Sequence, residues 1–273
     1  MKRIIKFELK RAFVNRFFLA ALVVGIVISV LHIILVVIPA SKYLELHSYS
    51  KGVYPNSIYN TMLGFDMSSL YLALYTMLIP VLACLPFADS LYTDKKSGYI
   101  KYLYSKVEKG WYLLAKLIAN FLVAGTVVVF PLLLNLWGTA LFVPALIPQA
   151  STAQFPIFAY YMWSDLYYTF PMVYITLYGI IIFIYAGIFA CIGMMLSTFI
   201  KNRFVVLLLP FAIVTVWNFV ASQLSGNALA PAAFLRMDQL GGVHLNQMIC
   251  ILLILLACVV ALYCYEKRKH EIY

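Results

Sequence analysis

The chain has 273 residues, of which 64% are hydrophobic and only 11% are charged. A typical soluble domain carries about 25% charged residues, and apolar stretches as long as those found here are typical of membrane spans. The composition therefore excludes a soluble enzyme, a disordered chain and a disulfide-linked secreted module. The net charge of +10 would suggest nucleic acid in a soluble protein, but here the charges must first be placed relative to a bilayer.

Six stretches are long and apolar enough to cross a hydrocarbon core about 30 Å thick, which needs roughly 20 helical residues. We expect helices, because backbone polar groups cannot stay unpaired in lipid, and the segments lack the strict alternation of barrel strands. The sequence therefore predicts an all-α membrane protein with one domain and six transmembrane helices. The predicted spans are residues 17–38, 70–88, 111–137, 171–200, 204–222 and 246–265.

The first span could instead belong to a signal peptide, because a basic leader precedes it. However, residues 17–38 make a stretch of 22 residues, which is longer than a usual signal-peptide core, and Ile38-Pro39-Ala40 is a poor cleavage site. We therefore expect an uncleaved span.

The distribution of Lys and Arg predicts the orientation. Sixteen of the 20 basic residues fall before the first span, between the second and third spans, between the fourth and fifth, and after the sixth, and Lys116 lies just inside the third span on the same side. Lys42, Lys51 and Arg236 fall on the other side. Such an excess marks the cytoplasmic face. We predict a multi-pass protein of the bacterial cell membrane with both termini in the cytoplasm. Basic residues at this face can also hold anionic headgroups of the lipid bilayer, and no nucleic-acid partner is expected.

The first sixteen residues have the pattern of a short amphipathic helix. Ile5, Leu9, Ala12 and Phe13 repeat at helical spacing along one side. We predict an interfacial helix over residues 1–16 whose apolar side faces lipid at the inner surface. The alternative is a plain basic flank of the first span.

The connection between the second and third spans predicts a second amphipathic helix. After a break at Ser97-Gly98, Ile100, Leu103, Tyr104 and Val107 follow the i, i+3, i+4, i+7 pattern. Such a stripe can dock into a groove of a soluble partner, although lying on the lipid surface is the more common behaviour.

Two segments on the opposite side are neither spans nor ordinary loops. Residues 138–168 contain no Lys or Arg, one acid and three prolines, so we expect an apolar extracellular insert of short interfacial helices or a cap over the bundle. Residues 223–245 contain Pro231 and two adjacent glycines, and can partly re-enter the membrane where protein or water shields the backbone.

No catalytic motif is present. The sequence contains no GxxxxGK[ST] loop, no HExxH and no GxSxG, and its four histidines have no metal-binding spacing. The five cysteines lie within or at the ends of spans and include no CxxC, so they are expected to pack as small apolar residues. We predict no catalytic residue, no metal and no cofactor bound by this chain.

Few polar side chains lie inside the spans. His32 is the only ionisable residue well inside one; it could bind substrate, but a hydrogen bond to a neighbouring helix is the more common role. Asn120, Asn135 and Asn218 are candidates for lining a pathway, or simply for interhelical hydrogen bonds. Asp89 and Lys116 lie near the inner ends, where they can pair or extend toward water. The lack of acids inside the spans disfavours ion-driven transport.

The order of these features resembles the bacterial ABC-2-type exporter permeases over nearly the whole chain. The resemblance rests on the basic leader, on DKKSGYIKYLYSKVEKGWYLLAKLIANFLVAG, and on the later segments SDLYYTFPMVYITLYG and FIKNRFVVLLLPF. It implies that a separate ATPase subunit binds ATP and docks at the cytoplasmic face, and that a second permease subunit completes the pathway. The insert at residues 138–168 is longer and more apolar than in many members of that family.

The resemblance also assigns roles to segments. The leader is similar to the family's interface helix, residues 223–245 are similar to its re-entrant helices, and residues 98–109 correspond to its coupling helix. The expected ATPase contacts are therefore Gly98, Ile100, Lys101, Leu103, Tyr104 and Val107.

The predicted function is that of a permease subunit in an ATP-driven exporter of a peptide, lipid or amphiphilic drug. The alternative is a membrane scaffold or sensor subunit that docks a cytoplasmic partner without transporting. An intramembrane enzyme has the least support, because no nucleophile–base pair is visible.

Overall fold

The computed structural model describes residues 2–47, 56–67, 69–152, 154–200, 202–225, 229–239 and 242–269, without the side chains of 43–47 and 225. These residues form helices and connections, with no strand among them, which confirms the all-α class. The helices are α1 (Lys2–Phe13), α2 (Arg16–His32), η1 (Ile33–Val37), α3 (Ile38–His47), α4 (Ile58–Thr61), α5 (Leu70–Cys84), α6 (Ser90–Lys96), α7 (Tyr99–Tyr104), α8 (Lys109–Ala140), η2 (Ala150–Thr152), α9 (Ser164–Thr169), α10 (Pro171–Leu196), α11 (Arg203–Ser225), α12 (Pro231–Phe234) and α13 (Leu245–Arg268).

Five of the six predicted spans are helices long and apolar enough to cross a membrane. They are the continuous helix Arg16–Lys42 and the helices α8, α10, α11 and α13, taken over the described residues. These five helices are consistent with a multi-pass membrane protein.

The remaining predicted span is shorter than expected. We predicted residues 70–88, but α5 has 15 residues and ends at Cys84, so it is about 22 Å long against a core of about 30 Å. Pro86 explains the early end, because it has no N–H to continue the helix and its ring clashes with the preceding turn. The chain passes through turns until α6 begins at Ser90.

The first span is longer than expected, and its helix widens before a proline. Residues 33–37 form a π-helical turn directly ahead of Pro39, and α3 continues to His47. A wider turn accommodates the missing N–H and the bulky ring of proline, so the helix continues past it.

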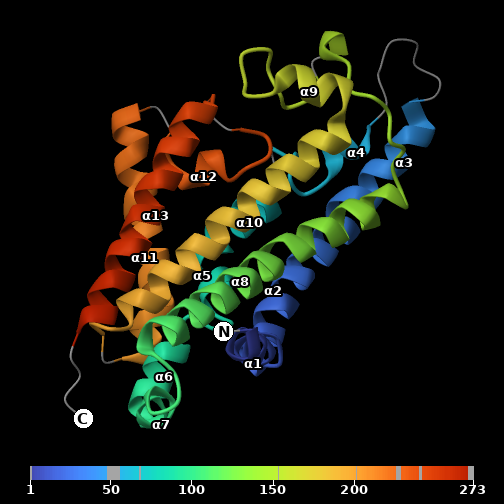
Figure 1. Ribbon diagram of the computed structural model, residues 1–273. Helices are drawn as coiled ribbons and strands as arrows, with labels where there is room; N and C mark the ends of the chain where they lie inside the picture. Colours follow the sequence, from blue (N-terminus) through green and yellow to red (C-terminus); the bar gives the residue numbers. More distant parts are fainter. Residues whose placement is uncertain are drawn as a thin grey trace.

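The bundle is centred on α8 and α10, which run diagonally side by side (Figure 1). Helices α1 and α2 pack on α8, α5 packs against both central helices, and α11 and α13 flank α10. Figure 1 shows α1, α6 and α7 at one end of the bundle, here called the α1 end, and α3, α4 and α9 at the other, here called the α9 end. The carboxyl end of α13 lies at the α1 end, where Tyr263 donates a hydrogen bond to the carbonyl of Gly110.

The amphipathic stripe of α1 packs against the protein. Ala12 is fully buried with Phe87, Ala119 and Val123, and Leu9 and Phe13 cover this cluster. We expected the stripe to face lipid; it faces α8 instead, because α1 is also held there by the ion pairs described below.

At the α9 end, the short helix α12 is buried, and side chains of α10 supply hydrogen bonds to its irregular surroundings. Tyr174 donates to the carbonyl of Met237 at 2.6 Å, and Tyr178 donates to the carbonyl of Phe234 at 3.4 Å. Protein thus shields this backbone, as the sequence argument required.

The insert at residues 138–168 contains little helix and covers the α9 end. Gln239 holds it to the α12 segment, because its amide accepts from the N–H of Met162 at 2.9 Å and donates to the carbonyl of the same residue at 2.7 Å. Ser57 donates to the carbonyl of Leu146 at 2.8 Å. The described part of the insert contains the last residues of α8, then η2 and α9.

Large apolar side chains remain exposed along several of the long helices. They include Leu19, Val23 and Val27 on α2, Phe204, Leu208 and Val216 on α11, and Leu253, Ile254 and Val260 on α13. Faces of this size require lipid or another subunit to cover them.

Helices α8 and α10 interlock through two glycines. Phe183 of α10 lies over Gly125 of α8, and Phe121 of α8 lies over Gly187 of α10, with the two rings edge to face at 5.8 Å. An added Cβ at Gly187 would lie 2.3 Å from the Phe121 ring.

We expect Gly125→Ala and Gly187→Ala each to lower the free energy of unfolding by about 1–3 kcal/mol, because either phenylalanine would have to leave its site. Gly179→Ala, also on α10, is the matched control: nothing lies within 4 Å of its added Cβ, so helix propensity makes it neutral or stabilising. Thermal unfolding in detergent measures all three variants. Equal midpoints for Gly187→Ala and Gly179→Ala would contradict the interlocked packing.

Candidate functional site

The segment between α5 and α8, here called the α6–α7 segment (residues 89–108), is the candidate site. Gly98 separates α6 from α7 with φ of +72°, a left-handed conformation that glycine adopts without strain. The predicted break at Ser97-Gly98 is confirmed, but the helix after it ends at Tyr104, and residues 105–108 form a turn and a short extended stretch before α8.

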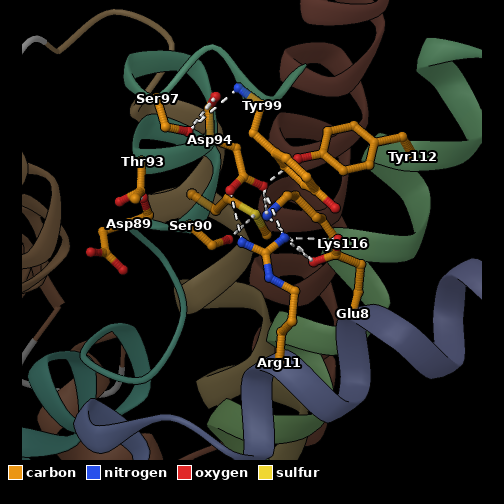
Figure 2. Close-up of polar contacts among 11 residues, drawn as sticks. Glu8, Arg11, Asp89, Ser90, Thr93, Asp94, Ser97, Tyr99, Tyr112 and Lys116 are labelled. Carbon is orange, nitrogen blue, oxygen red and sulfur yellow. Dashed lines mark hydrogen bonds and ion pairs between the residues drawn. The ribbon is translucent and has the colours of Figure 1, made fainter. Parts of the chain in front are cut away.

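A cluster of buried charges joins this segment to α1 and α8 (Figure 2). Arg11 of α1 contacts both carboxylate oxygens of Asp94 on α6, at 2.7 and 3.1 Å, and also pairs with Glu8 at 3.0 Å. Lys116 of α8 lies 2.8 Å from Asp94 and 3.4 Å from Glu8. The Tyr112 hydroxyl donates to Asp94 at 2.5 Å. We call these five residues the charge cluster.

The charge cluster is balanced and largely buried. Its two acids and Lys116 are nearly or fully buried, while the side chain of Arg11 is 30% exposed. Burial alone would raise the pKa of Asp94, but the hydrogen bonds from Arg11 and Tyr112 and the charge of Lys116 together hold that pKa below its usual value. Each buried charge is therefore stable only while its partners stay in place.

Two further ion pairs join the α6–α7 segment to the last two long helices. Lys95 pairs at 2.5 Å with Glu266, which is buried near the end of α13. Asp89 pairs with Arg203 at the start of α11, and the Arg203 guanidinium lies 4.5 Å from the centre of the Phe17 ring. The segment thus contacts α1, α8, α11 and α13 through charged side chains.

The predicted stripe of α7 faces the interior of the chain. Ile100 is fully buried, and Leu103, Tyr104 and Val107 pack partly buried against the main core. The predicted ATPase contacts therefore divide into an inward group and an outward one. Lys101 and Tyr102 are exposed, Gly98 is partly exposed, and Lys106 donates a hydrogen bond to the Tyr102 hydroxyl on the outer side.

Two of the four predicted pathway residues, His32 and Asn135, lie together inside the bundle. Both are fully buried. The Asn135 amide nitrogen lies 3.1 Å from His32 Nδ1 and 3.1 Å from the carbonyl of Ser29, and its oxygen accepts from the N–H of Leu63 at 2.8 Å. His32 Nε2 lies 3.3 Å from Asp66. Of the two roles considered, these contacts correspond to interhelical hydrogen bonding.

This network fixes the tautomer of His32. The N–H of Leu63 requires an acceptor, so the Asn135 oxygen must face it and the amide nitrogen must face His32. Nδ1 is then the acceptor, and the proton sits on Nε2, where it can be donated to Asp66.

The other two predicted pathway residues are separate from this pair. Asn218 of α11 accepts the N–H of Ala232 at 2.8 Å, and so holds the first turn of α12. Asn120 is fully buried on α8, one turn beyond Lys116, and neither of its amide atoms has a hydrogen-bond partner among the described residues.

Sequence reasoning missed Glu8, Asp94 and Glu266. A signal existed for Glu8, because it is the only acid in α1 and shares a helical face with Ile5 and Ala12. No comparable signal marks Asp94 or Glu266, since their partners lie on helices far away in the sequence.

The described residues contain no cluster of three or more His, Cys, Asp or Glu side chains that could hold a metal. Comparison with known proteins adds no assignment: no protein-family model matches the sequence, and no curated protein is similar to it.

We expect Asp94→Asn to destabilise the chain by about 3–5 kcal/mol, because it leaves Arg11 and Lys116 with one carboxylate between them in a buried site. Asp165→Asn, at an exposed position of α9, is the matched control and should change stability by less than about 0.5 kcal/mol. Thermal unfolding in detergent compares the two. A similar loss in both variants would contradict a special role for the charge cluster.

The lowered pKa of Asp94 also predicts a dependence on pH. The ionised form is favoured by folding, so its contribution is complete above the unfolded-state pKa of about 3.9 and is lost as the pH falls through the lower folded-state value. The difference in midpoint between wild type and Asp94→Asn should therefore be largest near pH 6 and shrink below pH 4. A difference that grows on acidification would contradict this sign.

Proposed function

We propose that this chain is the permease subunit of an ABC-2-type exporter in the bacterial cell membrane. The basic α1 end would face the cytoplasm, where a separate ATPase subunit would bind, and a second permease subunit would complete the pathway. All six apolar helices would cross the bilayer, with α5 extended at its ends by residues outside the helix.

The observation that carries the proposal is the set of ion pairs around the α6–α7 segment. One short segment contacts α1 and α8 through Asp94, α13 through Lys95, and α11 through Asp89. A segment with these contacts can pass a displacement to four helices at once. A surface helix with no such contacts would move alone.

In this mechanism, ATP-driven closure of the partner subunits pushes on residues 98–109. The displacement reaches α8 directly, because α8 follows this segment in the chain, and reaches α1, α11 and α13 through the ion pairs. Tilting of these helices relative to the second subunit then changes access to the pathway.

The proposed cargo is a peptide, lipid or amphiphilic drug. The exposed faces of α2, α11 and α13 are apolar, and an interface formed by such faces suits an amphiphile better than an ion. The polar atoms of His32 and Asn135 already bond within the chain, which makes them unsuited to coordinating an ion.

The outer side of α7 offers the sharpest test. Substituting Leu103 or Val107 with Asp would damage packing within the chain, whereas Tyr102 is 58% exposed. We expect Tyr102→Ala with Lys106→Glu to weaken co-purification with a co-expressed candidate ATPase by tenfold or more, because interfacial tyrosines often dominate binding. Stimulation of ATP turnover should fall with it.

Tyr160→Ala is the matched control, because Tyr160 is 70% exposed near the α9 end. It should leave association and ATP turnover unchanged. Unchanged association in the Tyr102 and Lys106 variant, with normal folding, would overturn the docking assignment. Flux into vesicles that contain both subunits separates an exporter from a scaffold or sensor subunit, which would bind the ATPase and move no cargo.

A further inference from the structure

An open cavity of about 640 Å³ lies between α6 and the start of α11, at the α1 end. It is separate from the charge cluster and from the outer side of α7. Its walls are formed by Tyr92, Thr93, Lys96, Ser97, Asn202, Arg203 and Phe204. We call it the α6–α11 cavity.

The walls of the cavity are mostly apolar and carry two basic side chains, Lys96 and Arg203. Lys96 is exposed, and its amine lies 6.0 Å from the centre of the Tyr92 ring. Arg203 pairs with Asp89 through Nε, and a guanidinium carries four further N–H donors. Because Arg203 and Asp89 neutralise each other, the net positive charge of the wall comes from Lys96. The hydroxyl of Thr93 adds a polar group to the same wall.

An apolar surface continues from the cavity along α11. Phe204 is 73% exposed and Leu208 is 53% exposed, and residues four apart lie on one face of a helix. Helix α11 is one of the five long enough to cross a membrane. A ligand that fits both surfaces has a compact anionic group and a long hydrocarbon chain.

We propose that the α6–α11 cavity binds the headgroup of an anionic phospholipid. The phosphate lies against Lys96 and Arg203, and an acyl chain follows Phe204 and Leu208 into the bilayer. Basic pockets between membrane helices at the cytoplasmic side recognise anionic headgroups in this way. A soluble phosphate would use the charges and leave the apolar face empty. Lipid binding at this cavity would occur whether or not the chain is an exporter.

The test counts bound lipids on the purified chain by native mass spectrometry. The probes are phosphatidylglycerol and phosphatidylcholine with identical acyl chains. Lys96→Gln should weaken phosphatidylglycerol binding about fivefold, and Thr93→Lys, which adds a charge to the same wall, should strengthen it about fivefold. Arg203 is left unchanged, because its pair with Asp89 also holds α11 to α6.

Lys106→Gln is the control, since Lys106 is an exposed lysine of the same segment outside the cavity; it should leave binding unchanged. Opposite shifts in Lys96→Gln and Thr93→Lys, seen with phosphatidylglycerol and not with phosphatidylcholine, would support the site. Equal binding of the two lipids, or no shift in either variant, would overturn it. Displacement of the lipid by an equal concentration of glycerol 3-phosphate would also overturn it, because that ligand has the phosphate without the acyl chains.

Discussion

The pairing of buried charges between α1, α6 and α8 is the constraint on which the rest of the α1 end depends. Two acids and two bases share a largely buried site, and a buried charge without a partner costs several kcal/mol. None of the three elements can therefore leave without exposing the charges of the other two. This requirement places the amphipathic stripe of α1 against α8, holds α6 in position, and thereby brings Lys95 and Asp89 to their partners on α13 and α11.

Much of the fold could be predicted because its signals are local. Long apolar runs predicted the five long helices. The Ser97-Gly98 pair predicted the break between α6 and α7, where Gly98 has a left-handed backbone conformation. The errors also have local causes. Pro86 ends α5 early, whereas Pro39 is accommodated by a π turn and does not end its helix. A proline in the sequence therefore marks a possible bend or end of a helix, but its position alone does not say which of the two occurs.

The candidate site was predicted only in part, because its partners are distant in the sequence. The periodicity of Ile100, Leu103 and Val107 indicated an apolar face correctly, yet could not indicate that the face is covered by the same chain. The position of Lys116 near the inner end of its span allows it either to pair or to extend toward water. That position does not reveal its partners, because Glu8 and Asp94 lie on other helices. Likewise, His32 and Asn135 are far apart in the sequence, so their positions do not indicate that one hydrogen-bonds to the other.

The reciprocal placement of Phe121 over Gly187 and Phe183 over Gly125 restricts how the molecule can change shape. If one helix slid along the other by a turn, each ring would meet a side chain where it now meets a glycine. Axial sliding between α8 and α10 therefore requires both rings to leave their glycine sites, so this packing favours movement of the two helices as one unit.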